Sequence, residues 1–286
     1  MERWFDSLIM FCRLVSRQII RIQGPDSLKL LQALSTNQMN RLALGPVYSG
    51  FLEPNGRVLF DAFLYPEIGK NDSFLLDIDR DVELLAKAHI RKYLMRSKVT
   101  VHDAPEFEIW QSWAKANTSI HIPNIHKWIS AIDPRCSALG VRHVIPTADS
   151  QISATFKDIN HGQVSEVDYT INRIMNAVPE GPRCLIPHVA LAQESNLDYL
   201  HASILKSHIV DYNKGCYLGQ ELTIRTHHVG VVRKRIVPVQ FGELYASIDI
   251  EPAQNIPLTC HVATLHLRLS TAWRFVIRMA KRLASC

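Results

Sequence analysis

The stretch that carries most information in this chain is K-G-C-Y-L-G-Q-E-L-T-I-R-T-H-H, residues 214–228. Two glycines flank Cys216, which allows a tight backbone turn and close approach of a ligand. The run Gly219-Gln220-Glu221 is typical of the start of a short helix. A helix N-terminus and the nearby Lys214 both favour the thiolate form of a cysteine. Cys216 is therefore a candidate nucleophile, redox centre or metal ligand, with a buried residue in a glycine-rich turn as the alternative.

The rest of the chain has the composition of a globular protein. Its 286 residues are enough for about two domains. Hydrophobic residues make up 47% and charged residues 21%, so the chain can bury enough apolar surface to fold. No apolar run reaches the roughly 18 residues that a membrane-spanning helix needs, so we expect no membrane span.

The net charge of +5 does not indicate nucleic-acid binding. Five of the 32 Lys and Arg residues follow Glu251, where there is no Asp or Glu, which leaves 27 basic against 27 acidic residues in the range 1–251. A site for a phosphate backbone needs basic residues concentrated on a folded face. Only the C-terminal stretch and Arg233-Lys234-Arg235 show clustering, and the latter alternates with apolar residues like a strand edge. We expect no nucleic-acid partner.

The six cysteines lie at least 26 residues apart and form no C-x-x-C pair. This spacing excludes a zinc ribbon or an iron-sulfur site with its own local ligands. His227 and His228 are expected on a strand, where adjacent side chains point to opposite faces, so they do not predict a metal site together.

The N-terminus allows two interpretations. Residues 7–25 contain no acidic side chain, and an arginine recurs every fourth residue from Arg13 to Arg21, as in an organelle-import helix. The run R-Q-I-I-R-I-Q at 17–23 instead alternates like a first strand. We favour the strand there and assign residues 1–15 to a presequence or leader.

The remaining pattern predicts a mixed α+β architecture with antiparallel pairing. Asn55-Gly56 suits a tight hairpin turn between two apolar segments, at 50–52 and 58–65. A helix should follow Pro25, and another at 82–94 should bury Leu84, Leu85 and Ala88. Further strands are expected at 74–78, 98–102, 107–113 and 128–132, and a later helix at 169–178.

The quoted stretch also resembles a known signature. K-G-C-Y-x-G-Q-E followed by T-x-R-T-H-H-V-G-V-V-R-K-R is similar to the motif of the mitochondrial iron-sulfur cluster assembly factors of the YgfZ/GcvT folate-binding superfamily. The likeness covers about residues 16–240 in family order. It includes the runs at 21–26, 30–32, 36–38, 56–61, 178–181 and 194–198.

The resemblance implies an aminomethyltransferase-like, folate-binding α+β core at 16–240 and a small β-barrel after it. It implies an accessory role in the maturation of [4Fe-4S] client enzymes in the mitochondrial matrix. It further implies A-type scaffold proteins as partners, with Cys216 as ligand to a shared cluster, and tetrahydrofolate as a cofactor. The cofactor-binding residues that it implies are Lys214, Gly215, Cys216, Tyr217, Gly219, Gln220, Glu221 and Arg225.

Three departures from the family pattern bear on activity. The aminomethyltransferase hairpin has paired aspartates where this chain has Phe60-Asp61, and its pterin-anchoring glutamate aligns near Met175. A phenylalanine cannot shuttle a proton, and methionine cannot accept the hydrogen bonds of a pterin. Residues 241–286 lack the expected glycine-punctuated barrel strands and end in an amphipathic stretch at 265–283. The alternative function, a folate-dependent one-carbon transferase, would use Asp61 as its catalytic carboxylate.

Overall fold

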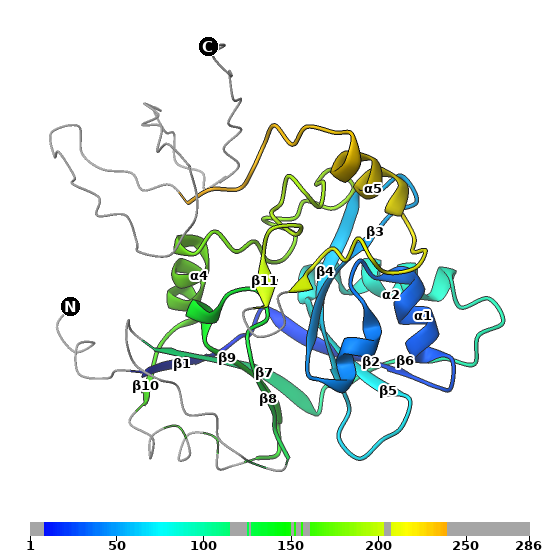
Figure 1. Cartoon of the computed structure of the whole chain (residues 1–286). Coiled ribbons are helices and arrows are strands. Elements are labelled where there is room, and N and C mark those ends of the chain that lie inside the picture. The colour runs from blue at the N-terminus through cyan, green and yellow to red at the C-terminus, as the bar shows by residue number, and fades with distance from the viewer. Residues whose placement is uncertain are drawn as a thin grey trace, which may run out of the picture.

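The computed structural model describes residues 9–114, 125, 127–149, 152, 156, 161–202 and 207–238. Two five-stranded sheets dominate it (Figure 1). The first has the order β3-β4-β5-β2-β6, and all its neighbours are antiparallel. Its strands are β2 (Arg17–Gln23), β3 (Val47–Leu52), β4 (Val58–Pro66), β5 (Ser73–Asp79) and β6 (Thr100–Asp103).

The second sheet has the order β10-β1-β7-β9-β8 and is antiparallel except for the β1–β10 pair. Its strands are β1 (Ile9–Arg13), β7 (Phe107–Ala114), β8 (Ile129–Ile132), β9 (Val141–Pro146) and β10 (His161–Gln163). Strands β11 (His201–Ala202) and β12 (Ser207–His208) form a separate short ladder.

The α-helices are short and lie outside the sheets. They are α1 (Ser27–Leu34), α2 (Glu83–Lys92), α4 (Glu166–Met175) and α5 (Gln220–His228). The described residues also form the 3-10 turns η1 (Met39–Ala43), η2 (Arg80–Val82) and η3 (Ser137–Leu139). Within the described ranges, no helix has the length and apolar character needed to cross a bilayer.

The predicted hairpin is confirmed. β3 and β4 pair antiparallel around the Asn55-Gly56 turn, and Gly56 has φ of +83°, a conformation that favours glycine. The mixed α+β class is confirmed as well. The strands expected at 17–23, 74–78, 98–102, 107–113 and 128–132 correspond to β2, β5, β6, β7 and β8.

Apolar side chains fill three layers. One cluster lies between the two sheets and contains Phe63 of β4 and Val144 of β9. A second joins the outer face of the first sheet to α1 and α2, where Leu31 and Ile90 are fully buried. A third covers the far side of the second sheet, with Phe11 and Trp110 stacked. The middle of the first sheet is thus buried on both faces, since every residue of β4 from Val58 to Tyr65 is buried.

Two expectations are corrected here. Helix α2 buries Ala86, His89 and Ile90. Of the residues expected to be buried, Leu85 is half-buried against the core, whereas Leu84 is 82% exposed and Ala88 is exposed too. The turn η2 directly precedes α2, and the Asp79 side chain caps it by accepting from the N–H of Asp81 at 2.9 Å. The folded chain also extends into the expected leader, because β1 lies within residues 1–15. Residues 1–8 and the C-terminal region 241–286 lie outside the described residues.

His89 makes the stability of the fold depend on pH. Its side chain packs edge-on against Phe60, with ring centroids 5.9 Å apart. Burial, and then the charge of Lys92, lowers the pKa of His89 to about 4, whereas a histidine in an unfolded chain titrates near pH ~6.5. The unfolded chain therefore binds this proton first as the pH falls. We expect the free energy of unfolding to decrease between those two pKa values, by at most about 1.4 kcal/mol per pH unit.

Urea denaturation across that pH window tests this expectation. His89→Phe keeps an aromatic ring at the position and removes the titrating group. The variant should lose part of the pH dependence seen in the native chain. An identical pH dependence in both proteins would contradict the role of His89.

Candidate functional site

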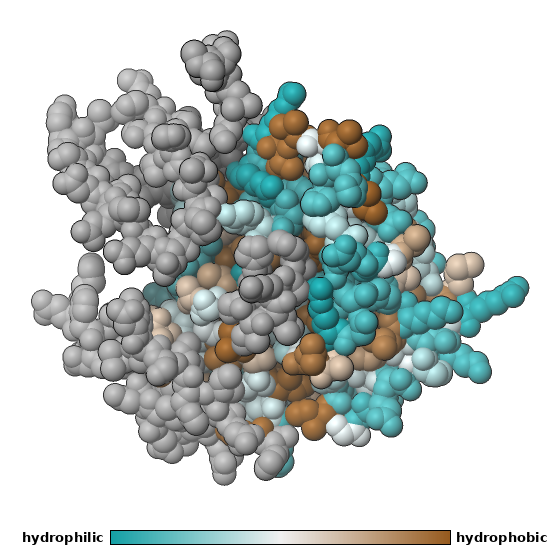
Figure 2. All heavy atoms as spheres, viewed as in Figure 1, coloured by the Kyte–Doolittle hydropathy of each residue, from teal (hydrophilic) through white to brown (hydrophobic). Residues whose placement is uncertain are grey.

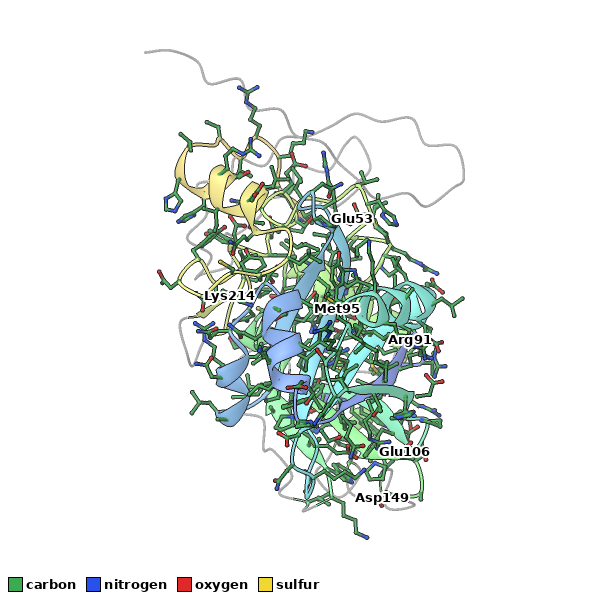
Figure 3. All side chains as sticks on the ribbon, turned by 90° about the vertical axis from the view of Figure 1, so that its right-hand side faces the viewer. Glu53, Arg91, Met95, Glu106, Asp149 and Lys214 are labelled. Atoms are coloured by element: carbon green, nitrogen blue, oxygen red, sulfur yellow. The ribbon has the colours of Figure 1, made fainter. Side chains whose placement is uncertain are left out.

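The loop that carries Cys216 is fastened to the end of α1. Lys214 is buried, and its Nζ donates to the carbonyl oxygens of Gln32, Ser35 and Asn37 at 2.7, 2.6 and 2.9 Å. Figure 3 shows Lys214 beside α1, below α5. These carbonyls lie at the negative end of a helix, where a cation is stabilising. Burial lowers the pKa of Lys214 to about 7, but three acceptors match the three N–H groups of the charged form.

Further bonds fix the loop on both sides of the cysteine. The backbone N–H of Leu218 donates to Ala33 O at 2.9 Å, again at the end of α1. The hydroxyl of buried Tyr217 lies 2.8 Å from Thr223 Oγ1 in α5. The side chain of Gln220 accepts from the N–H of Tyr217 at 3.0 Å. The backbone around Cys216 is thus held by α1 and by the first turn of α5.

Two glycines let α5 begin directly against the β3–β4 hairpin. Gly219 has φ of +80°, and a Cβ atom there would lie 2.3 Å from Glu53 O and 3.2 Å from Gly56 Cα. A Cβ atom at Gly56 would lie 2.5 Å from Leu222 Cβ and 3.0 Å from Gly219 O. Any larger residue at either position would separate the loop from the hairpin. The hairpin therefore helps to position Cys216.

Four of the predicted site residues face solvent. Gly215, Cys216, Glu221 and Arg225 are exposed, and a Cβ atom at Gly215 would have no neighbour within 4 Å. Among the described cysteines, Cys216 is the exposed one. Burial raises the thiol pKa of Cys12 and of Cys136, which disfavours their reactive thiolate forms.

The predicted site residues thus fall into two groups. Lys214, Tyr217, Gly219 and Gln220 build the loop from inside, whereas Gly215, Cys216, Glu221 and Arg225 are presented to solvent. Within the described part of the chain, no three His, Cys, Asp or Glu residues gather closely enough to hold a metal ion. The described residues at this loop offer one thiolate ligand, so a cluster bound here would need its other ligands from outside the described residues.

The expectations for the segment after the loop need correction. His227 and His228 lie in the last turn of α5, not on a strand, and His227 stacks on Tyr212 with centroids 3.7 Å apart. Residues 229–238 form no strand. The Arg235 guanidinium instead donates to Asp198 at 2.9 Å, and this side-chain pairing fixes the segment. Figure 2 shows apolar groups over α5 at the top of the molecule. After α5 ends, Val229 is 82% and Val231 73% exposed.

A second polar cluster lies fully buried between the two sheets. Asp77 on β5 bridges Arg17 on β2 and Arg142 on β9, at 2.6 and 2.7 Å. Glu180 pairs with Arg135 and Arg142 and accepts from Tyr169 OH at 2.8 Å. Burial alone would raise the pKa of Glu180, but these arginines hold it well below its usual value.

Asp61 belongs to this buried cluster. Its side chain is 1% exposed; Oδ1 accepts from Gly181 N at 2.9 Å, and Oδ2 accepts from Tyr48 OH at 3.0 Å. A general base must reach the proton that it removes. Both carboxylate oxygens of Asp61 already have internal partners. The geometry therefore favours a structural role for Asp61 over the catalytic role of the transferase alternative.

The residues of this cluster do not fit a bound folate. The aminopyrimidine edge of a pterin donates hydrogen bonds and requires a free carboxylate. The carboxylates described above, Asp61, Asp77 and Glu180, already have internal partners. The buried guanidinium atoms left without a hydrogen bond, Arg17 Nη1 and Arg142 Nη2, are donors. Met175, which aligns with the pterin-anchoring glutamate, is 68% exposed at the end of α4.

Sequence reasoning missed the roles of Gly56 and of the buried ion cluster. A signal was present for the cluster. Asp77 and Arg142 are charged residues with apolar neighbours in their strands, and a charged residue that is buried there needs a partner. The partners come from separate strands, so local spacing does not identify them.

The chain is similar to curated proteins over most of its length. It is 37% identical over 274 residues to the mitochondrial iron-sulfur cluster assembly factor IBA57 homolog of Mycosarcoma maydis, covering 90% of this chain and 64% of that protein. It is 34% identical over 261 residues to the human mitochondrial iron-sulfur cluster assembly factor IBA57, covering 85% and 70%. The chain belongs to the IBA57 family of mitochondrial iron-sulfur cluster assembly factors. No model in a scan of protein families matches it.

The chain spans about half to two thirds of the length of the fungal IBA57 homologs that it matches, from 52% in Neurospora crassa to 64% in Mycosarcoma maydis. Among solved structures, it is similar to the glycine cleavage system aminomethyltransferase T from Bartonella henselae, with a TM-score of 0.52 and 13% identity. That match covers 67% of this chain and 56% of the other. It shows that this IBA57 family member has an aminomethyltransferase-like fold.

Proposed function

We propose that this chain is a non-enzymatic accessory factor for the assembly and maturation of [4Fe-4S] proteins in the mitochondrial matrix. In this proposal Cys216 supplies one ligand to a cluster that is shared with an A-type scaffold protein and passed on to client [4Fe-4S] enzymes. The similarity to mitochondrial iron-sulfur cluster assembly factors of the IBA57 family supports the class of function. The observation that carries the site is the exposed thiol of Cys216 on a loop that is fixed before it by Lys214 and after it by Tyr217.

The geometry of the loop suits an iron-sulfur cluster that is bound temporarily and then transferred. A [4Fe-4S] cluster takes four ligands, usually thiolates, and this loop contributes one from the described residues. A single ligand cannot retain a cluster without a partner, which makes binding dependent on the complex. Because the loop is already ordered by Lys214 and Tyr217, little conformational entropy is lost when the partner docks. The exposed Val229 and Val231 follow the other end of α5 and add apolar surface for such docking.

Cys216→Ser is expected to abolish the shared cluster while leaving the fold intact, because Cys216 is exposed. The measurement is anaerobic cluster reconstitution of the chain mixed with an A-type scaffold, followed by visible absorption. The native mixture should show a cluster spectrum that neither protein gives alone, and the mixture with the Cys216→Ser variant should lose or change it.

Cys184→Ser is the matched control. Cys184 is a half-buried thiol that accepts from Arg173 Nη1 at 3.5 Å, and serine can keep this contact. The control should reproduce the native spectrum. If Cys216→Ser also reproduced it, the proposed ligand role would be wrong. Titration of the native chain with reduced folate then tests the transferase alternative, which requires tight binding that depends on Asp61.

A further inference from the structure

A basic loop, residues 91–98, forms the end of helix α2 and the turn after it. Its basic side chains are all exposed: Arg91, Lys92, Arg96 and Lys98. No acidic residue occurs in the range 84–102, and the acids on either side of it, Glu83 and Asp103, both pair with Lys87. Within the described part of the chain, no ion pair involves the four exposed side chains. The loop therefore carries a positive charge that no ion pair neutralises.

The tip of the basic loop is a methionine in a strained conformation. The backbone N–H of Ser97 donates to Leu94 O at 2.7 Å, which closes a turn around Met95 and Arg96. Met95 has φ of +44°, in the left-handed region that is unfavourable for a residue with a Cβ atom. Its side chain is 90% exposed. Strain of this kind is concentrated at sites that bind a ligand or a partner.

Both ends of the basic loop are fastened to the fold. The backbone N–H of Tyr93 donates back into the last turn of α2 at 3.1 Å. At the other end, Asp26 Oδ2 accepts from the backbone N–H of Lys98 at 2.8 Å. Figure 1 shows the segment after α2 extending outward at the right of the molecule, and Figure 3, seen from that side, shows Arg91 and Met95 on the near face. The loop is thus an ordered projection.

We propose that the basic loop binds the surface of a bilayer that contains anionic phospholipids. Basic side chains are attracted to the phosphates of such a surface, and an apolar side chain between them enters the boundary of headgroups and acyl chains. Acidic groups of a protein would pair with the basic side chains but not with Met95. Single-stranded nucleic acid is bound by exposed aromatic rings, whereas Tyr93 is half-buried, with Lys92 Nζ 5.6 Å from its ring centroid.

Co-sedimentation of the full chain with lipid vesicles tests the proposal. The native chain should bind vesicles of equal parts phosphatidylcholine and phosphatidylglycerol, and should not bind vesicles of phosphatidylcholine alone. Arg96→Glu reverses one charge of the loop and should lower the binding constant by about tenfold or more. Met95→Ser keeps the charge and removes the apolar tip, so it should lower the binding constant by about threefold or more.

Arg233→Glu is the matched control for the charge reversal. Arg233 is exposed beyond α5, and its reversal changes the net charge by the same amount. This variant should bind the anionic vesicles like the native chain, and thermal melts should show that all variants fold. Cys216→Ser should also bind them like the native chain, which keeps this test separate from the proposed function.

Three results would overturn the proposal. The first is a native chain that binds anionic vesicles no better than vesicles of phosphatidylcholine alone. The second is an equal loss of binding in Arg96→Glu and Arg233→Glu, because net charge and not the loop would then decide binding. The third is binding of the native chain to immobilised polyglutamate but not to the vesicles, which would assign the loop to an acidic protein partner.

Discussion

Asp77→Asn is expected to destabilise the protein by about 3–5 kcal/mol, because it removes the charge that compensates two buried arginines. Asp77 has no exposed surface, and its two carboxylate oxygens bond Arg17 and Arg142 on different sheets. Without the carboxylate, two guanidinium groups lose a close counter-charge in a dry interior. For a domain of this size we expect the melting temperature to fall by about 10 °C.

Thermal or urea denaturation measures this effect, with Asp81→Asn as the matched control. Asp81 is exposed in the neighbouring turn η2 and makes no buried ion pair. The control should change the free energy of unfolding by less than about 0.5 kcal/mol. A native melting temperature for Asp77→Asn would mean that the buried cluster does not hold the two sheets together.

Gly219→Ala is expected to disturb both stability and the cysteine loop. The left-handed conformation alone costs a residue with a Cβ atom about 1–3 kcal/mol. The added atom would also lie 2.3 Å from Glu53 O and 2.8 Å from Leu52 Cβ, so α5 must move away from the hairpin. Because Gly219 also begins α5, this movement should displace the loop that presents Cys216. We expect a lower melting temperature and weaker cluster formation with the scaffold.

Gly215→Ala separates the structural effect from the functional one. Gly215 flanks the same cysteine, but a Cβ atom there meets nothing within 4 Å, and its φ is not in the left-handed region. Its melting temperature should match that of the native chain. If Gly219→Ala were as stable as Gly215→Ala, the close packing of hairpin against α5 would not be what positions the loop.

Local signals in the sequence were sufficient for the strands and the hairpin. The Asn55-Gly56 turn and the alternation at 17–23 act over a few neighbouring residues, and both predictions hold. Such local signals could not predict which face of α2 packs against the sheet. Several of its apolar residues are compatible with either face, and the choice depends on the turn η2 and on the sheet beneath.

The sequence was sufficient to predict which segment forms the candidate site. It was not sufficient to predict the contacts that this segment makes in the folded chain. The motif around Cys216 and the Thr36-Asn37-Gln38 run were both recognised in the sequence, yet only the fold shows that Lys214 bonds Asn37 O. The same holds for the contact between Gly56 and Gly219, which are 163 positions apart. Such contacts depend on chain topology, so no spacing rule could have revealed them.

Alkylation of the cysteines in the native chain tests the central claim most directly, because it reports on Cys216 itself. Iodoacetamide labelling, read by mass spectrometry, should modify exposed Cys216 in the free chain and leave buried Cys12 unmodified. Mixing with the A-type scaffold and assembling the cluster should protect Cys216 from labelling, whereas mixing without iron and sulfide should not. Labelling of Cys216 at an undiminished rate in the cluster-loaded complex would contradict its role as a ligand.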